Sequence, residues 1–189
     1  MRYSFIIGLI LLFLSTPLET FACSCKWGGN FIKVAKRSNF VIKGRVADRT
    51  YHLSNGKSYN TLQEALKAEN ESGTEYKLGE SITVEILQVI QGSKTVKKIR
   101  IITSSGADCR VGTHNFEVGS TYMFSLRKSI WPDSEVVGEL SSDYVIFGCS
   151  EHWLKFDSAN NSVTGYIKGR RRSKIRTWPY EKLLARIED

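Results

Sequence analysis

The sequence predicts a mainly β fold, a small sandwich or barrel, with short helices beside it. Several short segments rich in β-branched and aromatic residues alternate with turns that contain glycine, which is typical of small all-β domains. The 189 residues include 41% hydrophobic and 24% charged side chains, an ordinary globular composition. One domain with its own hydrophobic core is therefore expected.

Residues 1–22 have the pattern of a secretory signal peptide. A short positive start precedes an apolar run that ends at Leu14, and the small residue Ala22 precedes Cys23. The run is shorter than the roughly 20 residues that a membrane-spanning helix needs. We expect a secreted protein, extracellular or periplasmic, whose mature chain begins at Cys23. A lipid anchor on this cysteine is less favoured, because the residues before it fit a lipoprotein signal poorly.

The first expected elements of the mature chain are a helical turn and a strand. The turn covers Lys33–Ser38, with Phe31, Val34 and Ala35 on the side that could be buried. The strand covers Phe40–Val46, a segment of β-branched and aromatic residues.

The polar stretch 48–80 is expected to be a long connection that contains one surface helix. Thr61 and Glu64 form a capping-box signature, and good helix formers follow at positions 65–68. Long connections of this kind are uncommon and are often functional.

Two segments after this connection predict a β-hairpin, Ile82–Ile90 and Val96–Thr103, separated by a turn with Gly92. Apolar residues alternate up to Ile86 and then change parity at Leu87, which indicates a bulge or a coiled strand.

The remaining elements are two strands and a C-terminal helix. One strand covers Thr121–Leu126, and another lies within Val136–Leu140 or Tyr144–Phe147. A short helix is expected over Tyr180–Ile187, after a proline that suits a helix start.

The four cysteines are expected to form disulfides, because secretion places them in an oxidising compartment. Cys23 and Cys25 are separated by one residue, so a bond between them would be strained. Two pairings remain: Cys23 with Cys109 and Cys25 with Cys149, or the crossed arrangement. The spacing lacks the paired short knuckles of a structural zinc site, and no metal site is predicted.

An ordered set of five segments resembles the netrin-like (NTR) module of the tissue inhibitor of metalloproteinases (TIMP) family, including its small single-domain bacterial relatives. The segments are Cys23-Ser24-Cys25, Phe40–Val46, Cys109–Gly112, Phe116–Phe124 and Phe147–Ser150. The resemblance covers residues 23–153 and implies a five-stranded OB-fold barrel. It leaves 154–189 as a basic C-terminal extension with a short helix. It also implies the disulfides Cys23–Cys109 and Cys25–Cys149.

The resemblance implies that this TIMP-like protein inhibits secreted zinc metalloproteases through its mature N-terminus. The α-amino nitrogen and carbonyl oxygen of Cys23 would chelate the target's zinc, Ser24 would enter the adjacent pocket, and Cys25 would complete the protease-binding segment. A catalytic zinc keeps an open position for such ligands. A free α-amine has a pKa of about 7.7–8.0, so part of it is neutral and able to bind zinc at physiological pH. The protein needs no cofactor of its own.

The alternative is a non-enzymatic extracellular binding module for anionic glycans or membrane surfaces. The chain carries a formal net charge of +8, and one segment concentrates positive charge. The basic residues of that segment are Lys168, Arg170, Arg171, Arg172, Lys174 and Arg176. A second basic strip comprises Lys94, Lys97, Lys98 and Arg100. Export argues against nucleic acid as a partner, and a monomer is expected.

No catalytic residues are predicted. The sequence contains no His-Glu-x-x-His, no glycine-rich phosphate loop and no Gly-x-Ser-x-Gly motif. His52, His114 and His152 are scattered and are expected to be loop or structural histidines. We therefore expect that the protein is not an enzyme.

Overall fold

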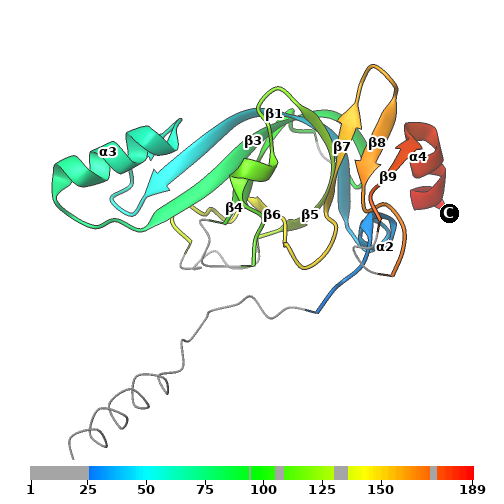
Figure 1. Cartoon of the computed structure of the whole chain (residues 1–189), viewed down its shortest axis with the longest axis horizontal. Coiled ribbons are helices and arrows are strands. Elements are labelled where there is room, and N and C mark those ends of the chain that lie inside the picture. Colours follow the sequence, from blue (N-terminus) through cyan, green and yellow to red (C-terminus); the bar gives the residue numbers. More distant parts are fainter. Residues whose placement is uncertain (1–25, 94, 105–108, 130–135, 171–173) are drawn as a thin grey trace, which may run out of the picture.

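The computed structural model describes residues 26–93, 95–104, 109–129, 136–170 and 174–189, and these residues form a mainly β fold (Figure 1). The elements in chain order are α2 (Phe31–Ala35), β1 (Phe40–Leu53), β2 (Ser58–Tyr59), α3 (Leu62–Ser72), β3 (Leu78–Gln91), β4 (Lys98–Thr103), the 3-10 helix η1 (Thr113–Asn115), β5 (Thr121–Lys128), β6 (Tyr144–Val145), β7 (Trp153–Asp157), β8 (Ser162–Gly165), β9 (Arg176–Pro179) and α4 (Tyr180–Glu188).

The strands form one nine-stranded sheet in the order β2-β1-β3-β4-β6-β5-β7-β8-β9. An additional antiparallel pairing of β1 with β5 curls part of this sheet into what we call the strand ring, made of β1, β3, β4, β6 and β5. The order β5-β1-β3-β4 is that of a Greek key, and β6 joins it by pairing in parallel with β4 and antiparallel with β5.

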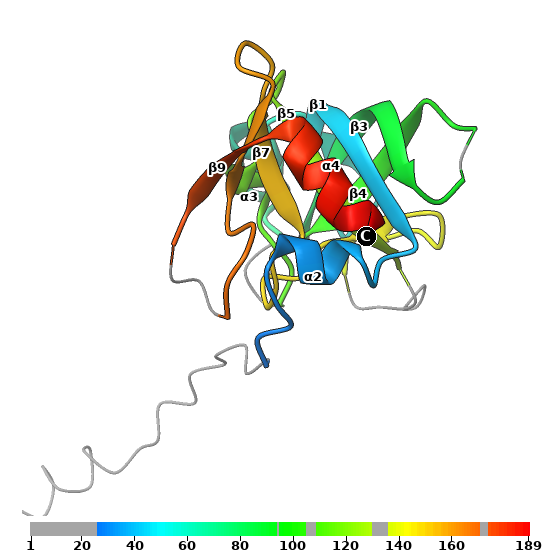
Figure 2. The same cartoon turned by 90° about the vertical axis from the view of Figure 1, so that its right-hand side faces the viewer.

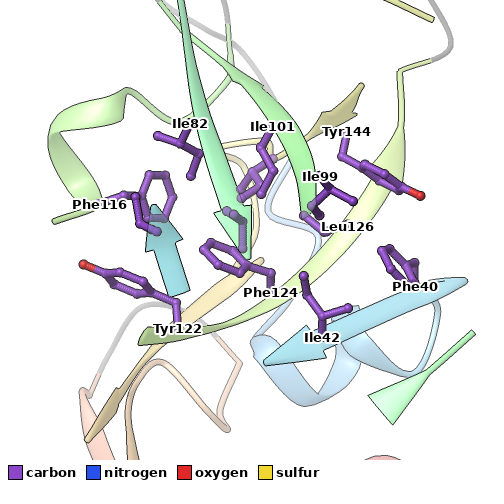
Figure 3. Packing of buried hydrophobic residues seen from close by; sticks show 13 residues of the cluster. Phe40, Ile42, Ile82, Ile99, Ile101, Phe116, Tyr122, Phe124, Leu126 and Tyr144 are labelled. Atoms are coloured by element: carbon purple, nitrogen blue, oxygen red, sulfur yellow. The ribbon is translucent and has the colours of Figure 1, made fainter. Parts of the chain in front are cut away.

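The main hydrophobic core fills the inside of the strand ring. Because side chains alternate across a strand, Phe40 and Ile42 of β1 point into this core, whereas Val41 points to the outer face. Figure 3 shows the cluster, which comprises Phe40, Ile42, Val46, Ile82, Val84, Ile99, Ile101, Phe116, Tyr122, Phe124, Leu126, Tyr144 and Ile146.

A second core lies on the outer face of the sheet, under the helices α2 and α4. Figure 2 shows the two helices close together against the strands. Phe31 and Ala35 of α2 pack in one cluster with Leu183 and Ile187 of α4 and with Met123 of β5. Residues near both ends of the described chain therefore share one hydrophobic core.

Several predicted elements are confirmed. Strand β1 starts at the predicted Phe40 but continues to Leu53, because its pairing with β3 extends beyond the predicted segment. The capping box of α3 forms, with the Thr61 side chain accepting from the Glu64 amide and the Glu64 carboxylate accepting from the Thr61 amide. The C-terminal helix α4 also begins at the predicted residue.

The change of parity in β3 corresponds to a bulge. Lys43 pairs with Gln88 and Gly44 pairs with Ile86, so Leu87 is the extra residue on β3. Its side chain is exposed.

Other features differ from the prediction. Of the two alternatives for the last strand, the Tyr144–Phe147 segment contains β6, and positions 136–140 form no strand. Helix α2 begins at Phe31, two residues before the predicted turn, because Asn30 caps it there. Strands β2, β7, β8 and β9 have no counterpart among the predicted elements, and β7 spans positions 153 and 154.

Candidate functional site at the N-terminal segment

The predicted protease-binding residues Cys23, Ser24 and Cys25 lie outside the described residues. The structure does describe Cys109 and Cys149, the predicted disulfide partners of Cys23 and Cys25. No cysteine in the described part of the chain is free. The pairing itself stays a prediction.

Cys109 and Cys149 belong to two segments that lie side by side. The amide of Gly148 donates to the carbonyl of Cys109 at 2.7 Å, and Arg110 forms an antiparallel bridge with Phe147. The bond from Gly148 brings the backbone at both cysteines to one place on the molecule.

The chain that follows Cys25 is bound to the same place. We call Lys26–Asn30 the N-terminal segment. The amide of Gly28 donates to the carbonyl of Cys149 at 3.0 Å, and the amide of Glu151 donates to the carbonyl of Gly29 at 3.0 Å. A Cβ at position 28 would clash with the hydroxyl of Ser150, so any other residue here would force that side chain to rotate away.

The other side of the N-terminal segment is held by the stretch between β8 and β9. The Asn30 side chain donates from Nδ2 to the carbonyl of Gly169 at 2.7 Å, while its Oδ1 accepts from the Lys33 amide at 3.1 Å and caps α2. The amide of Phe31 donates to the carbonyl of Tyr166 at 3.1 Å. The capping role of Asn30 is readable from sequence as an asparagine before an apolar run, but the link to Gly169 has no local signal.

The basic C-terminal residues that the structure describes are all exposed. These are Lys168, Arg170, Lys174 and Arg176, whereas Arg171 and Arg172 lie outside the described residues. Lys168 and Arg170 flank Gly169, so this basic stretch starts beside the N-terminal segment. Within the described residues, the four exposed cations form no ion pair.

The second basic strip is only partly available to an anion. Lys97 and Lys98 are exposed, and Lys94 lies outside the described residues. Arg100 is not available in the same way, since its Nε and Nη2 donate to the carboxylate of Asp143 at 2.9 and 2.6 Å. Asp143 is buried, so this arginine is part of an internal ion pair.

Two histidines are buried in separate hydrogen-bonding positions. The Nδ1 and Nε2 atoms of His52 lie 2.8 Å from the hydroxyls of Ser58 and Ser81, respectively. The Nδ1 atom of His152 lies 2.9 Å from the carbonyl of Ser125. Burial lowers the pKa of both imidazoles. His114 is exposed.

Among the described residues, no group of three or more His, Cys, Asp or Glu side chains could hold a metal ion. The helices in that part of the chain are too short or too polar to cross a membrane. Comparison with protein-family models and with curated proteins finds no match for this chain.

Proposed function

We propose that the protein is a secreted inhibitor of zinc metalloproteases that binds its target through the mature N-terminus, Cys23-Ser24-Cys25. The observation that carries this proposal is the docking of the N-terminal segment between Cys149 on one side and Gly169 on the other. Such docking reduces the conformational entropy that the first residues would lose when they enter a protease.

The strand ring supports the finer part of the proposal, a five-stranded OB-fold of the netrin-like type. Its strands follow a Greek-key order, and the pairing of β1 with β5 curls them into a partial ring. The flanking helices α2 and α4 complete the fold on the outer face of the sheet.

The positions of Cys109 and Cys149 support bonds from both to the Cys23-Ser24-Cys25 segment, and we propose the pairings Cys23–Cys109 and Cys25–Cys149. The bond from Gly28 places the chain just after Cys25 beside Cys149, and Cys109 lies next to that segment through Gly148. Two bonds at this place would fix the α-amine of Cys23, which is the group that chelates zinc in the proposed mechanism. Peptide mapping by mass spectrometry without reduction tests the pairing.

The decisive experiment compares two forms of the mature protein against a panel of zinc metalloproteases. One form begins at Cys23 and the other carries one additional alanine before it, which moves the α-amine away from the zinc without changing the fold. Inhibition by the first form alone supports the proposal. Equal inhibition by both forms, or none by either, would refute chelation by Cys23.

A second candidate function is the binding of anionic glycans or membrane surfaces through the C-terminal basic residues. The exposure of Lys168, Arg170, Lys174 and Arg176, without ion pairs in the described structure, favours it. Retention on heparin should fall steeply as salt rises, because such binding releases counterions. Replacing these four residues by glutamine should weaken retention strongly if this surface carries it.

A further inference from the structure

A cavity of about 580 Å³ lies where the start of β1, the end of β5 and β6 meet, and it uses none of the residues assigned above to the protease or to the C-terminal basic segment. Its volume is within the range of small-molecule sites, roughly 300–1,000 Å³. It opens to solvent, so a ligand can reach it.

The rim of the cavity is positively charged. Arg37, Arg110, Arg127 and Lys128 line it, and no Asp or Glu is among the described residues that do so. Arg110 is neutralised by the buried Glu139 at 3.0 Å. Arg37 and Arg127 are exposed and form no ion pair within the described residues.

Lys128 is exposed, and two contacts hold its ammonium. Its ammonium donates to the carbonyl of Ser142 at 2.8 Å and lies 4.7 Å from the centre of the Tyr144 ring. Arg37 and Arg127 place positive charge around a concave surface, and such charge attracts anions more strongly than charge on a flat face.

The floor of the cavity is apolar. Phe40, Leu126 and Tyr144 are buried core residues that reach this surface from inside the strand ring, and Figure 3 shows them at one side of the cluster. The rings of Phe40 and Tyr144 lie 5.2 Å apart, and half-buried Phe147 extends the apolar lining.

We propose that this basic cavity binds an organic anion with an apolar body, the anionic group contacting Arg37 and Arg127 and the apolar part covering Phe40, Leu126 and Tyr144. A hydrocarbon chain brings more apolar area to this floor than a sulfated sugar, whose surface is mostly polar, and therefore gains more from being buried there. A free carboxylate amphiphile and the headgroup region of an anionic lipid share this chemistry.

The test measures binding of decanoate below its micellar concentration to the full mature chain by titration calorimetry. Decanamide, which has the same length without charge, and inorganic sulfate, which has charge without an apolar body, serve as matched probes. We expect decanoate to bind more tightly than either, with amide shifts in the nuclear magnetic resonance spectrum centred on Arg127 and Val145. Equal affinity for decanamide or sulfate, or no binding of decanoate, would overturn the proposal.

A charge variant and its control locate the site. Arg37→Gln with Arg127→Gln should weaken decanoate binding by about tenfold or more, since charged hydrogen bonds are being removed. Lys67→Gln with Lys77→Gln removes the same charge from exposed positions near α3 and should leave the affinity unchanged. Equal weakening by both pairs would indicate a general charge effect and contradict the site. The single reversal Arg127→Glu provides a second variant at the rim.

Vesicles that contain phosphatidylglycerol distinguish the two sources of the ligand. Vesicle binding that decanoate displaces, and that the Arg37/Arg127 variant loses, supports a lipid headgroup as the source. Binding of decanoate without binding of vesicles supports a free amphiphile. Vesicle binding that the variant retains would assign membrane binding to another surface and count against the cavity.

Discussion

The guanidinium of Arg110 and the carboxylate of Glu139 form an ion pair of 3.0 Å, in which the two side chains are only 7% and 1% exposed. The Ser129 hydroxyl also donates to Glu139. The pair joins the segment after Cys109 to the turn between β5 and β6, two parts of the chain that local sequence does not connect.

Removing one partner of this pair should strongly destabilise the protein. Glu139→Ala removes the carboxylate that faces the buried guanidinium, and we expect a loss of about 3–5 kcal/mol in the free energy of unfolding, measured in urea. Arg110→Met combined with Glu139→Leu removes both charges and should recover much of that loss. Glu71→Gln, in an exposed pair with Lys67, is the control and should change little. Similar losses in the single and double variants would contradict this account.

Buried His152 should make stability fall in mild acid. Burial lowers its pKa below the ordinary value of 6.5, and Arg127 lowers it further. The unfolded chain therefore binds the proton more readily, so the free energy of unfolding is largest above pH 6.5 and falls as the pH drops towards the lowered pKa. His152→Asn should flatten this dependence in urea titrations, whereas exposed His114→Gln should leave it in place. An unchanged slope in His152→Asn would contradict the assignment.

Tyr180 should make stability fall at high pH. Its hydroxyl donates to Gln88 at 2.9 Å, and burial, with the Glu181 carboxylate nearby, raises its pKa to about 12. The unfolded phenol loses its proton near pH 10, so stability present below pH 10 is lost as the pH rises towards 12. Tyrosinate absorbance should show a late-titrating residue that disappears in Tyr180→Phe and remains in Tyr59→Phe. A titration curve unchanged by Tyr180→Phe would refute the shift.

The capping box should stabilise α3 locally rather than the whole fold. Thr61→Ala removes the acceptor for the Glu64 amide, and we expect α3 to lose about 1 kcal/mol against local opening. Of the side chains of α3, only Ala65 is buried, so hydrogen exchange should accelerate in this helix and stay unchanged in β1 and β5. Faster exchange throughout β1 would show that α3 is coupled to the core.

Local sequence predicts this fold best where the signal lies within one element. The alternation in β5, the capping box at Thr61 and the parity change at Leu87 are all short-range patterns, and each has its counterpart in the structure. Helix α2 starts two residues before the predicted turn, because the side chain of Asn30 caps it.

Features that depend on distant partners were not predictable in this way. Strand β6 is two residues long, and its position depends on pairing with both β4 and β5. The bond between Asn30 and Gly169 joins positions 139 residues apart. The basic cavity also depends on distant partners, because its lining residues Arg37 and Arg127 come together only through the pairing of β1 with β5.

The hairpin of β1 and β3 extends well past the strand ring. β1 pairs with β5 only as far as Arg45, whereas its pairing with β3 continues to Leu53 opposite Leu78 and leaves α3 at the far end (Figure 1). The chain between Leu53 and Leu78 contributes no strand to the strand ring. The length of this connection therefore does not affect how the ring forms. Lengthening such a connection costs little, about 0.6 kcal/mol for each doubling. The region of α3 is therefore where this fold can accept inserted residues or a reporter tag without disturbing either core.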